Sequence, residues 1–128
     1  MAALRTLIVD DSAVMRKIIE RSLRQAGIPL ERVVEAANGS QALDILGQQA
    51  IDLVLSDINM PIMDGLELVR QLHKLDNPCQ APVLMISTEG SESQVMEAIA
   101  CGARGYVRKP FTPEQIRKQV LSVLGQPN

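Results

Sequence analysis

The amino-acid sequence predicts an α/β fold in which helices cover both faces of a doubly wound, five-stranded parallel sheet. Three observations predict this fold. Five apolar runs of strand length alternate with five amphipathic segments of helix length. Such regular alternation favours parallel strands joined by right-handed crossovers. The third run is apolar at almost every position, which is typical of a strand buried on both faces.

The strands are predicted from β-rich apolar runs separated by turn-forming residues. The chain of 128 residues has the length of one domain, and we expect residues 1–128 to form a single domain. Hydrophobic residues make up 46% of the chain but aromatic residues only 2%, so its core must be aliphatic. The strands are expected at residues 4–10, 32–36, 51–57, 83–87 and 104–109.

The helices are predicted from apolar residues that recur on one helical face. Ser12 is suited to cap the first helix, and a serine is also available to cap the fourth, which ends at Gly102. In the last helix, Thr112 is the N-cap, Pro113 occupies the first position and Gln115 completes a capping box. The helices are expected at residues 12–26, 38–49 and 66–75, from Ser91 or Ser93 to Gly102, and from Thr112 onward.

The charge and composition exclude several classes of protein. The net charge of −2 and the pI of about 5.4 argue against a surface that binds nucleic acid or acidic membranes. No apolar run approaches the roughly 20 residues needed to span a bilayer, and the N-terminus does not read as a signal peptide. We therefore expect a cytoplasmic protein in which Cys79 and Cys101 are reduced thiols.

Chemically active residues follow four of the five predicted strands. The carboxyl ends of parallel strands meet at one edge of a sheet, where doubly wound folds bind their ligands. The second strand ends in Glu35 and Ala36 and brings no comparable group to this edge. The residues expected at the edge are Asp10, Asp11, Asp57, Ser87, Thr88 and Lys109.

Three neighbouring carboxylates favour a bound cation, because without one their mutual repulsion makes it unfavourable for all three to be ionised. An oxygen-rich site with few protein ligands suits Mg²⁺, which in turn binds phosphate oxygens. Lys109 and Ser87 could neutralise and hydrogen-bond the remaining oxygens. Asp57 ends the most buried strand, and it is the best placed to attack phosphorus and form an acyl phosphate.

Each of these residues also has an ordinary structural interpretation. Asp10 or Asp11 could cap a helix, Asp57 could form an Asx turn and Lys109 could be solvated. Because all of these residues converge on one edge of the sheet, a functional role is favoured over these separate structural interpretations. The single histidine, His73, is expected on an exposed helix surface, and the methionines are expected to fill the core. The absence of a GxGxxG motif after the first strand disfavours a dinucleotide site.

Four motifs resemble those of the receiver domains of bacterial two-component signalling. They are "LIVDDS", "DLVLSDINMPIMDGLEL", "VLMISTEG" and "GYVRKPFTPEQI", and the similarity covers about residues 4–124. The stand-alone chemotaxis type is the most similar. The resemblance implies a flavodoxin-like (βα)5 fold with strand order 2-1-3-4-5.

The resemblance also implies roles for the residues of the edge. Asp57 would be the phospho-acceptor. Asp11, Asp57 and the backbone carbonyl of Asn59 would ligate Mg²⁺ directly, while Asp10 would act mainly through water. Lys109 would contact the phosphoryl group, and the family typically has a cis peptide before the proline that follows it.

Five positions take further roles from the family. Ser87 would be the switch hydroxyl, Thr88 would affect access to the acceptor, and Tyr106 would be the aromatic switch residue. Asn59 and Glu89 match the chemotaxis type at the two positions that tune lifetime, so the phosphoryl group is expected to decay in tens of seconds rather than hours. Ser12 departs from the bulky residue often found after the acidic pair.

The implied function is a phosphorylation-activated switch that changes a protein-binding surface formed by helix four, strand five and helix five. A histidine kinase would donate the phosphoryl group, a downstream protein would read the surface, and the chain would act as a monomer. It would catalyse only its own phosphorylation and dephosphorylation. A phosphorelay intermediate and the receiver part of a longer transcription regulator are the alternatives.

Two other classes fit the sequence less well. A Mg²⁺-dependent phosphohydrolase would need a general-acid Asp at the place of Asn59. A purely structural module would be expected to lack Asp11, Asp57 or Lys109, and all three are present.

Overall fold

The computed structural model of the protein describes residues 2–74, 81–88 and 92–125. Its strands form one parallel sheet in the order β2-β1-β3-β4-β5, so the expected fold class and strand order are confirmed. Within the described residues, no helix combines the length and apolar character needed to cross a membrane. The strands are β1 (Leu4–Val9), β2 (Leu30–Ala36), β3 (Leu53–Ser56), β4 (Val83–Ser87) and β5 (Gly105–Arg108).

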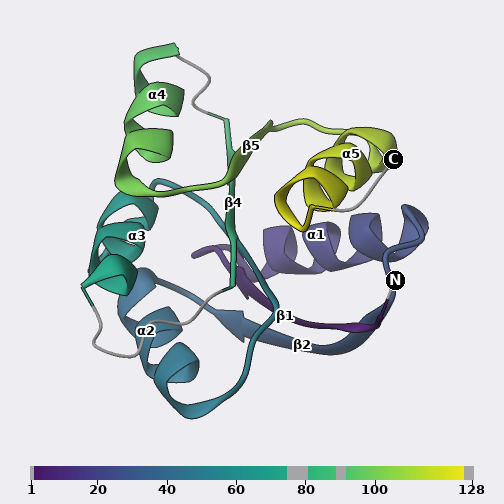
Figure 1. Cartoon of the computed structure of the whole chain (residues 1–128), viewed down its shortest axis with the longest axis horizontal. Helices are drawn as coiled ribbons and strands as arrows, with labels where there is room; N and C mark the ends of the chain where they lie inside the picture. The colour runs from purple at the N-terminus through teal and green to yellow at the C-terminus, as the bar shows by residue number, and fades with distance from the viewer. Residues whose placement is uncertain (1, 75–80, 89–91, 126–128) are drawn as a thin grey trace.

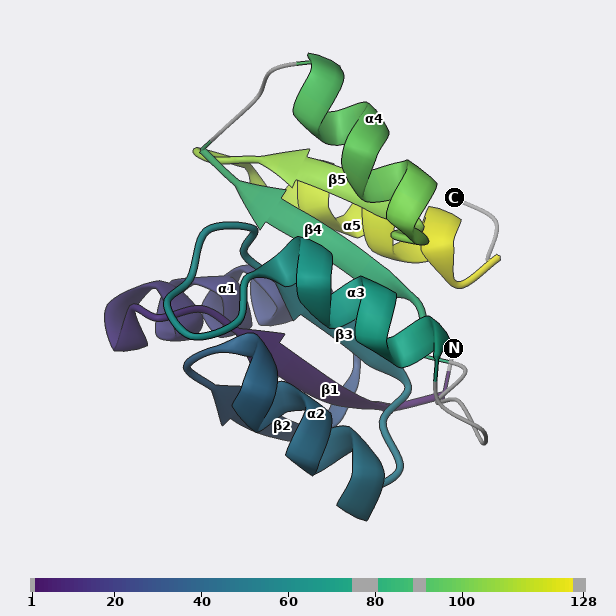
Figure 2. The same cartoon turned by 90° about the vertical axis from the view of Figure 1, so that its left-hand side faces the viewer.

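Helices cover both faces of the sheet. One face carries α1 and α5, and the other carries α2, α3 and α4 (Figure 1). Figure 2 shows the second face, with its three helices side by side in chain order. The helices are α1 (Ala13–Gln25), α2 (Gly39–Gln48), α3 (Gly65–His73), α4 (Glu92–Cys101) and α5 (Pro113–Val123).

The predicted boundaries differ from the observed ones by at most two residues where both ends are described. β2 begins at Leu30 because this residue already pairs with Leu4 of β1. β3 is shorter than expected, because its ladder with β1 begins only at Leu53. The proposed cap Ser93 is wrong, since it lies inside α4, whereas Ser91 lies outside the described residues.

The core is aliphatic, as expected, and the sheet divides it into two clusters. Along β1, Leu7 and Val9 face the cluster beneath α2, α3 and α4, while Ile8 between them faces the cluster beneath α1 and α5. This alternation is the period of two of a β-strand. Because both clusters bury β1, β3 and β4, these strands hold the residues that follow them in fixed positions.

Helix caps place the helices directly after the strands. The Ser12 side chain accepts a hydrogen bond from the Met15 amide at 3.2 Å, so α1 starts immediately after the two aspartates. Thr112 and Gln115 form the predicted capping box at the start of α5. His73 is exposed and Cys101 is a free thiol, as expected, whereas Cys79 lies outside the described residues.

At the amino end of the sheet, Arg5 and Asp52 join the start of β1 to the residue before β3. The amide and Nε of Arg5 donate to Asp52 Oδ2 at 2.8 and 3.0 Å, and Nη2 donates to Oδ1 at 2.9 Å. The side-chain hydrogen bonds from Arg5 hold the pKa of Asp52 below its usual value of 3.8, against the opposing effect of burial.

This pair predicts a pH-dependent contribution to stability. Because the folded-state pKa of Asp52 is lowered, its contribution is present above the unfolded-state value near 3.8 and is lost as the pH falls through the folded-state value. We expect Asp52→Asn to lower the thermal midpoint modestly at pH 7 and progressively less below pH 4, with the exposed Asp44→Asn as control. A deficit that grows as the pH falls would contradict this.

Candidate functional site

Three carboxylates meet at the carboxyl edge of the sheet. Asp10 and Asp11 directly follow β1, and Asp57 directly follows the neighbouring β3. One carboxylate oxygen from each of the three lies within 4.8 Å of the others. Asp10 is buried, with 1% of its surface exposed, whereas Asp57 is partly buried and Asp11 is exposed. The predicted acidic cluster is therefore present and opens toward solvent on one side.

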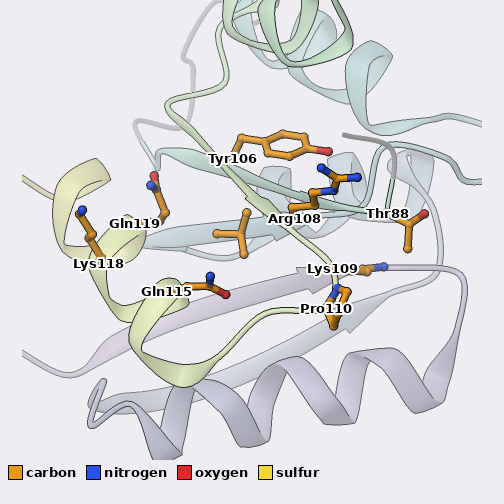
Figure 3. A pocket seen from close by; sticks show the side chains of 9 residues that line it. Thr88, Tyr106, Arg108, Lys109, Pro110, Gln115, Lys118 and Gln119 are labelled. Atoms are coloured by element: carbon orange, nitrogen blue, oxygen red, sulfur yellow. The ribbon is translucent and has the colours of Figure 1, made fainter. Parts of the chain in front are cut away.

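Lys109 reaches into this cluster from the end of β5. Its ammonium Nζ lies 3.0 Å from Asp10 Oδ2 and 3.5 Å from Asp57 Oδ2, and only 10% of the side chain is exposed. Figure 3 shows its amine directed away from α5. The backbone amide of Lys109 donates to the Ser87 carbonyl at 2.9 Å, and the Lys109–Pro110 peptide is cis, as expected.

Asp57 is fixed by its backbone and by its side chain. Its amide donates to the Val9 carbonyl at 2.8 Å, and its Oδ1 accepts from the Ile58 amide at 2.7 Å. Burial raises the pKa of Asp57 above its ordinary value; the charge of Lys109 opposes this shift, and that of Asp10 adds to it. The carboxylate is thus oriented and poorly solvated, and further positive charge would stabilise its ionised form.

Gly65 is a site residue that the sequence interpretation missed. A Cβ at this position would lie 2.2 Å from the backbone oxygen of Asp57 and 3.1 Å from Ile58 Cα. The Gly65 amide also donates to the Ile58 carbonyl at 2.8 Å. Only a glycine lets the first turn of α3 approach the backbone of Asp57 this closely. The signal was a glycine directly after the capping Asp64, where glycine is otherwise unfavourable for a helix.

Three further predicted residues, Ser87, Thr88 and Asn59, lie at or next to the same edge. Ser87 ends β4 and is buried, whereas Thr88 beside it is exposed. Asn59 is exposed in the loop that leaves Asp57. Glu89 lies outside the described residues.

A pocket of about 640 Å³ lies between β5 and α5, next to this edge (Figure 3). Tyr106 lines it, and so do Lys109 and Thr88 of the acidic site. Its basic residues are Arg108, Lys109 and Lys118, and among the described residues that line it none is acidic. The pocket therefore connects the acidic edge to a surface that favours acidic ligands.

The arrangement suits an oxygen-seeking divalent cation. Three carboxylates converge, one side is open to water, and such a donor set is typical of Mg²⁺ rather than of softer metals. Asp10, Asp11 and Asp57 fit this ion, and an open position suits a phosphate oxygen. The same site holds the ammonium of Lys109 beside the carboxylate of Asp57, a group that is chemically able to act as a nucleophile.

Comparison with known proteins identifies the family. A model of the response regulator receiver domain matches residues 6–121. The chain belongs to this family. This receiver domain is 39% identical over 123 residues to chemotaxis protein CheY1 of Helicobacter pylori, covering 95% of this chain and 98% of that protein. It is 37% identical to the chemotaxis protein CheY homolog of Campylobacter jejuni, covering 95% and 93% of the two chains.

Solved structures agree with this membership. The chemotaxis response regulator CheY4 of Vibrio cholerae has a TM-score of 0.83 and 36% identity, covering 96% of this receiver domain and 100% of that chain. The receiver domain of the sensor histidine kinase PA1611 from Pseudomonas aeruginosa has a TM-score of 0.82 and 26% identity, covering 98% and 100%. That structure holds a magnesium ion coordinated in its active-site cleft.

Proposed function

We propose that this receiver domain is a phosphorylation-activated switch of a CheY-like chemotaxis system, with Asp57 as the phospho-acceptor. The observation that carries the proposal is the meeting of Asp10, Asp11 and Asp57, with the ammonium of Lys109 paired to Asp10 and Asp57. The 35–39% identity to chemotaxis proteins over nearly their whole length favours chemotaxis among two-component pathways.

In the proposed reaction, a carboxylate oxygen of Asp57 forms a bond to the phosphorus of a phosphohistidine on a histidine kinase. The P–N bond breaks, its electron pair stays on the imidazole, and the product is an aspartyl phosphate. A bound Mg²⁺ would neutralise charge on the transferred group. Asp10, Asp11 and Asp57 would hold it, together with the backbone carbonyl of Asn59. Lys109 lies close enough to Asp57 to pair with a phosphoryl oxygen.

The proposed output is a change in the surface of α4, β5 and α5. Ser87 would move toward the phosphoryl group, and its backbone bond to Lys109 joins β4 to β5. Tyr106 of β5 would change its burial and thereby reshape the pocket beside α5. Because Arg108, Lys109 and Lys118 give the described lining of that pocket a positive charge, we infer that the downstream protein presents an acidic segment.

Incubation with acetyl phosphate and Mg²⁺, followed by mass spectrometry, tests the proposal. We expect the wild type to gain one phosphoryl group, Asp57→Asn to gain none, and the exposed Asp44→Asn to behave as the wild type. Omitting Mg²⁺ should prevent the gain. Thr88, Asn59 and Glu89 are proposed to set access and lifetime, and the label should decay in tens of seconds once the donor is removed. Equal labelling of Asp57→Asn would overturn the proposal.

A further inference from the structure

Behind the acidic pair, a charged chain links α1, β2 and the end of β1. The Arg16 guanidinium of α1 donates through Nη1 to the Asp10 carbonyl oxygen at 2.6 Å and through Nε to Glu35 Oε1 at 2.8 Å. Only 16% of the Arg16 side chain is exposed. On the other side, Lys17 donates to Glu35 Oε2 at 2.9 Å. β2 brings no group to the acidic edge itself, but its Glu35 holds the arginine that contacts the Asp10 backbone.

The carbonyl that Arg16 contacts belongs to the peptide unit joining Asp10 to Asp11. Asp10 has further anchors: its amide donates to Ala36, its Oδ1 accepts from the Ser12 amide at 2.9 Å, and its Oδ2 contacts Lys109. Asp11 is exposed, so the direction of its carboxylate depends on the backbone that carries it. Rotation of this one peptide plane would change the angle between the two carboxylates.

We propose that Arg16, oriented by Glu35, is a positioning residue that fixes the Asp10–Asp11 peptide and thereby sets the affinity of the acidic cluster for Mg²⁺. The inference rests on the proposed function, since it concerns the same site. Residues behind the direct ligands commonly change metal affinity 10- to 100-fold when they are replaced.

The chemistry of arginine suits this task. Its planar fork donates in two fixed directions at once, here to a carboxylate and to a backbone carbonyl. Lysine carries the same charge on a single nitrogen and cannot reproduce both bonds with that geometry. The ordinary pKa of Glu35, 4.5, already lies well below neutral pH, and its hydrogen bonds to Lys17 and Arg16 lower that pKa further. Glu35 is therefore an ionised acceptor for the guanidinium whether or not Lys17 is present.

The chain offers two matched controls for a purely structural role. Arg117 of α5 donates to the Ala26 carbonyl at 2.9 Å, the same kind of bond at the opposite end of α1. Lys17 contacts Glu35 and lies next to Arg16, but no bond from its amine to Asp10 is present in the described structure. Arg117→Met and Lys17→Met therefore remove comparable interactions without releasing the Asp10–Asp11 peptide.

The test is Mg²⁺ titration by calorimetry, with phosphorylation by acetyl phosphate at low and saturating Mg²⁺. We expect Arg16→Met to weaken Mg²⁺ binding about tenfold and Arg16→Lys to weaken it severalfold. Phosphorylation should be slow at low Mg²⁺ and recover at saturating Mg²⁺. Glu35→Met should also weaken binding, and adding it to Arg16→Met should cost nothing more, because both act through one contact. Both control variants should stay within twofold of the wild type.

The outcomes separate this inference from the proposed function. If the wild type neither binds Mg²⁺ nor is phosphorylated, the proposed function fails and the inference with it. If the wild type does both but Arg16→Lys and Glu35→Met bind Mg²⁺ within twofold of it, only the positioning role is overturned. These two milder variants decide the question should Arg16→Met not fold. Additive effects in the double variant would equally refute the action of Glu35 through Arg16.

Discussion

Gly65→Ala is expected to destabilise the fold by about 2 kcal/mol and to slow phosphorylation at least tenfold. The added methyl would lie 2.2 Å from the backbone oxygen of Asp57, a distance that real Cβ atoms do not tolerate. Because the atom it meets belongs to the backbone and cannot rotate away, either the start of α3 or the backbone of Asp57 must move. Urea unfolding measures the first effect, and the rate of labelling by acetyl phosphate measures the second.

Gly47→Ala in α2 is the matched control, because no atom lies within 4 Å of its Cβ position. There the substitution should be neutral or stabilise the helix by up to about 1 kcal/mol, and labelling should be unchanged. If Gly65→Ala unfolds at the same urea concentration as the wild type and is labelled at the same rate, the close approach of α3 to Asp57 does not constrain the site.

Lys109→Met is expected to lower the free energy of unfolding by about 3 kcal/mol in the absence of Mg²⁺. The change leaves the buried Asp10 without its ammonium partner and raises the pKa of Asp57 further, because the charge of Lys109 currently lowers it. Mg²⁺ should restore part of the loss, since it supplies positive charge to the same carboxylates. Labelling by acetyl phosphate should fall strongly at every Mg²⁺ concentration.

Lys118→Met, the same substitution on the exposed face of α5, should alter neither the stability nor the labelling rate. Chemical unfolding with and without Mg²⁺ makes the comparison. The prediction would be contradicted if both variants lost the same free energy of unfolding, or if Mg²⁺ did not change the stability of the Lys109 variant. Either result would mean that the ammonium does not neutralise the charge of the carboxylates.

The sequence predicted most of the site, because the chemistry of a parallel sheet depends on its strand ends. The alternation of strands and helices was enough to bring Asp10, Asp57 and Lys109 to one edge, and the structure places them there. Alternation alone does not order the strands, since every right-handed βα arrangement satisfies it. The order 2-1-3-4-5 was available only through family resemblance and is now observed.

Features that depend on contacts between distant elements were not predictable. The need for Gly65 arises where the start of α3 crosses the backbone of Asp57, and no local pattern encodes that distance. The pair of Arg16 and Glu35 joins a helix to a strand 19 residues away, so helical spacing could not reveal it. Glu35 was accordingly dismissed as a strand end without a role in the site.

The chain contains no tryptophan and a single tyrosine, Tyr106, a residue that lines the pocket beside α5. Ultraviolet emission from the unmodified polypeptide consequently arises almost wholly from one phenol on the proposed output surface. Spectroscopists thus have an intrinsic reporter at that position, with only a weak contribution from the single phenylalanine. No dye need be attached, and stopped-flow recordings could follow the conformational response of this surface in real time.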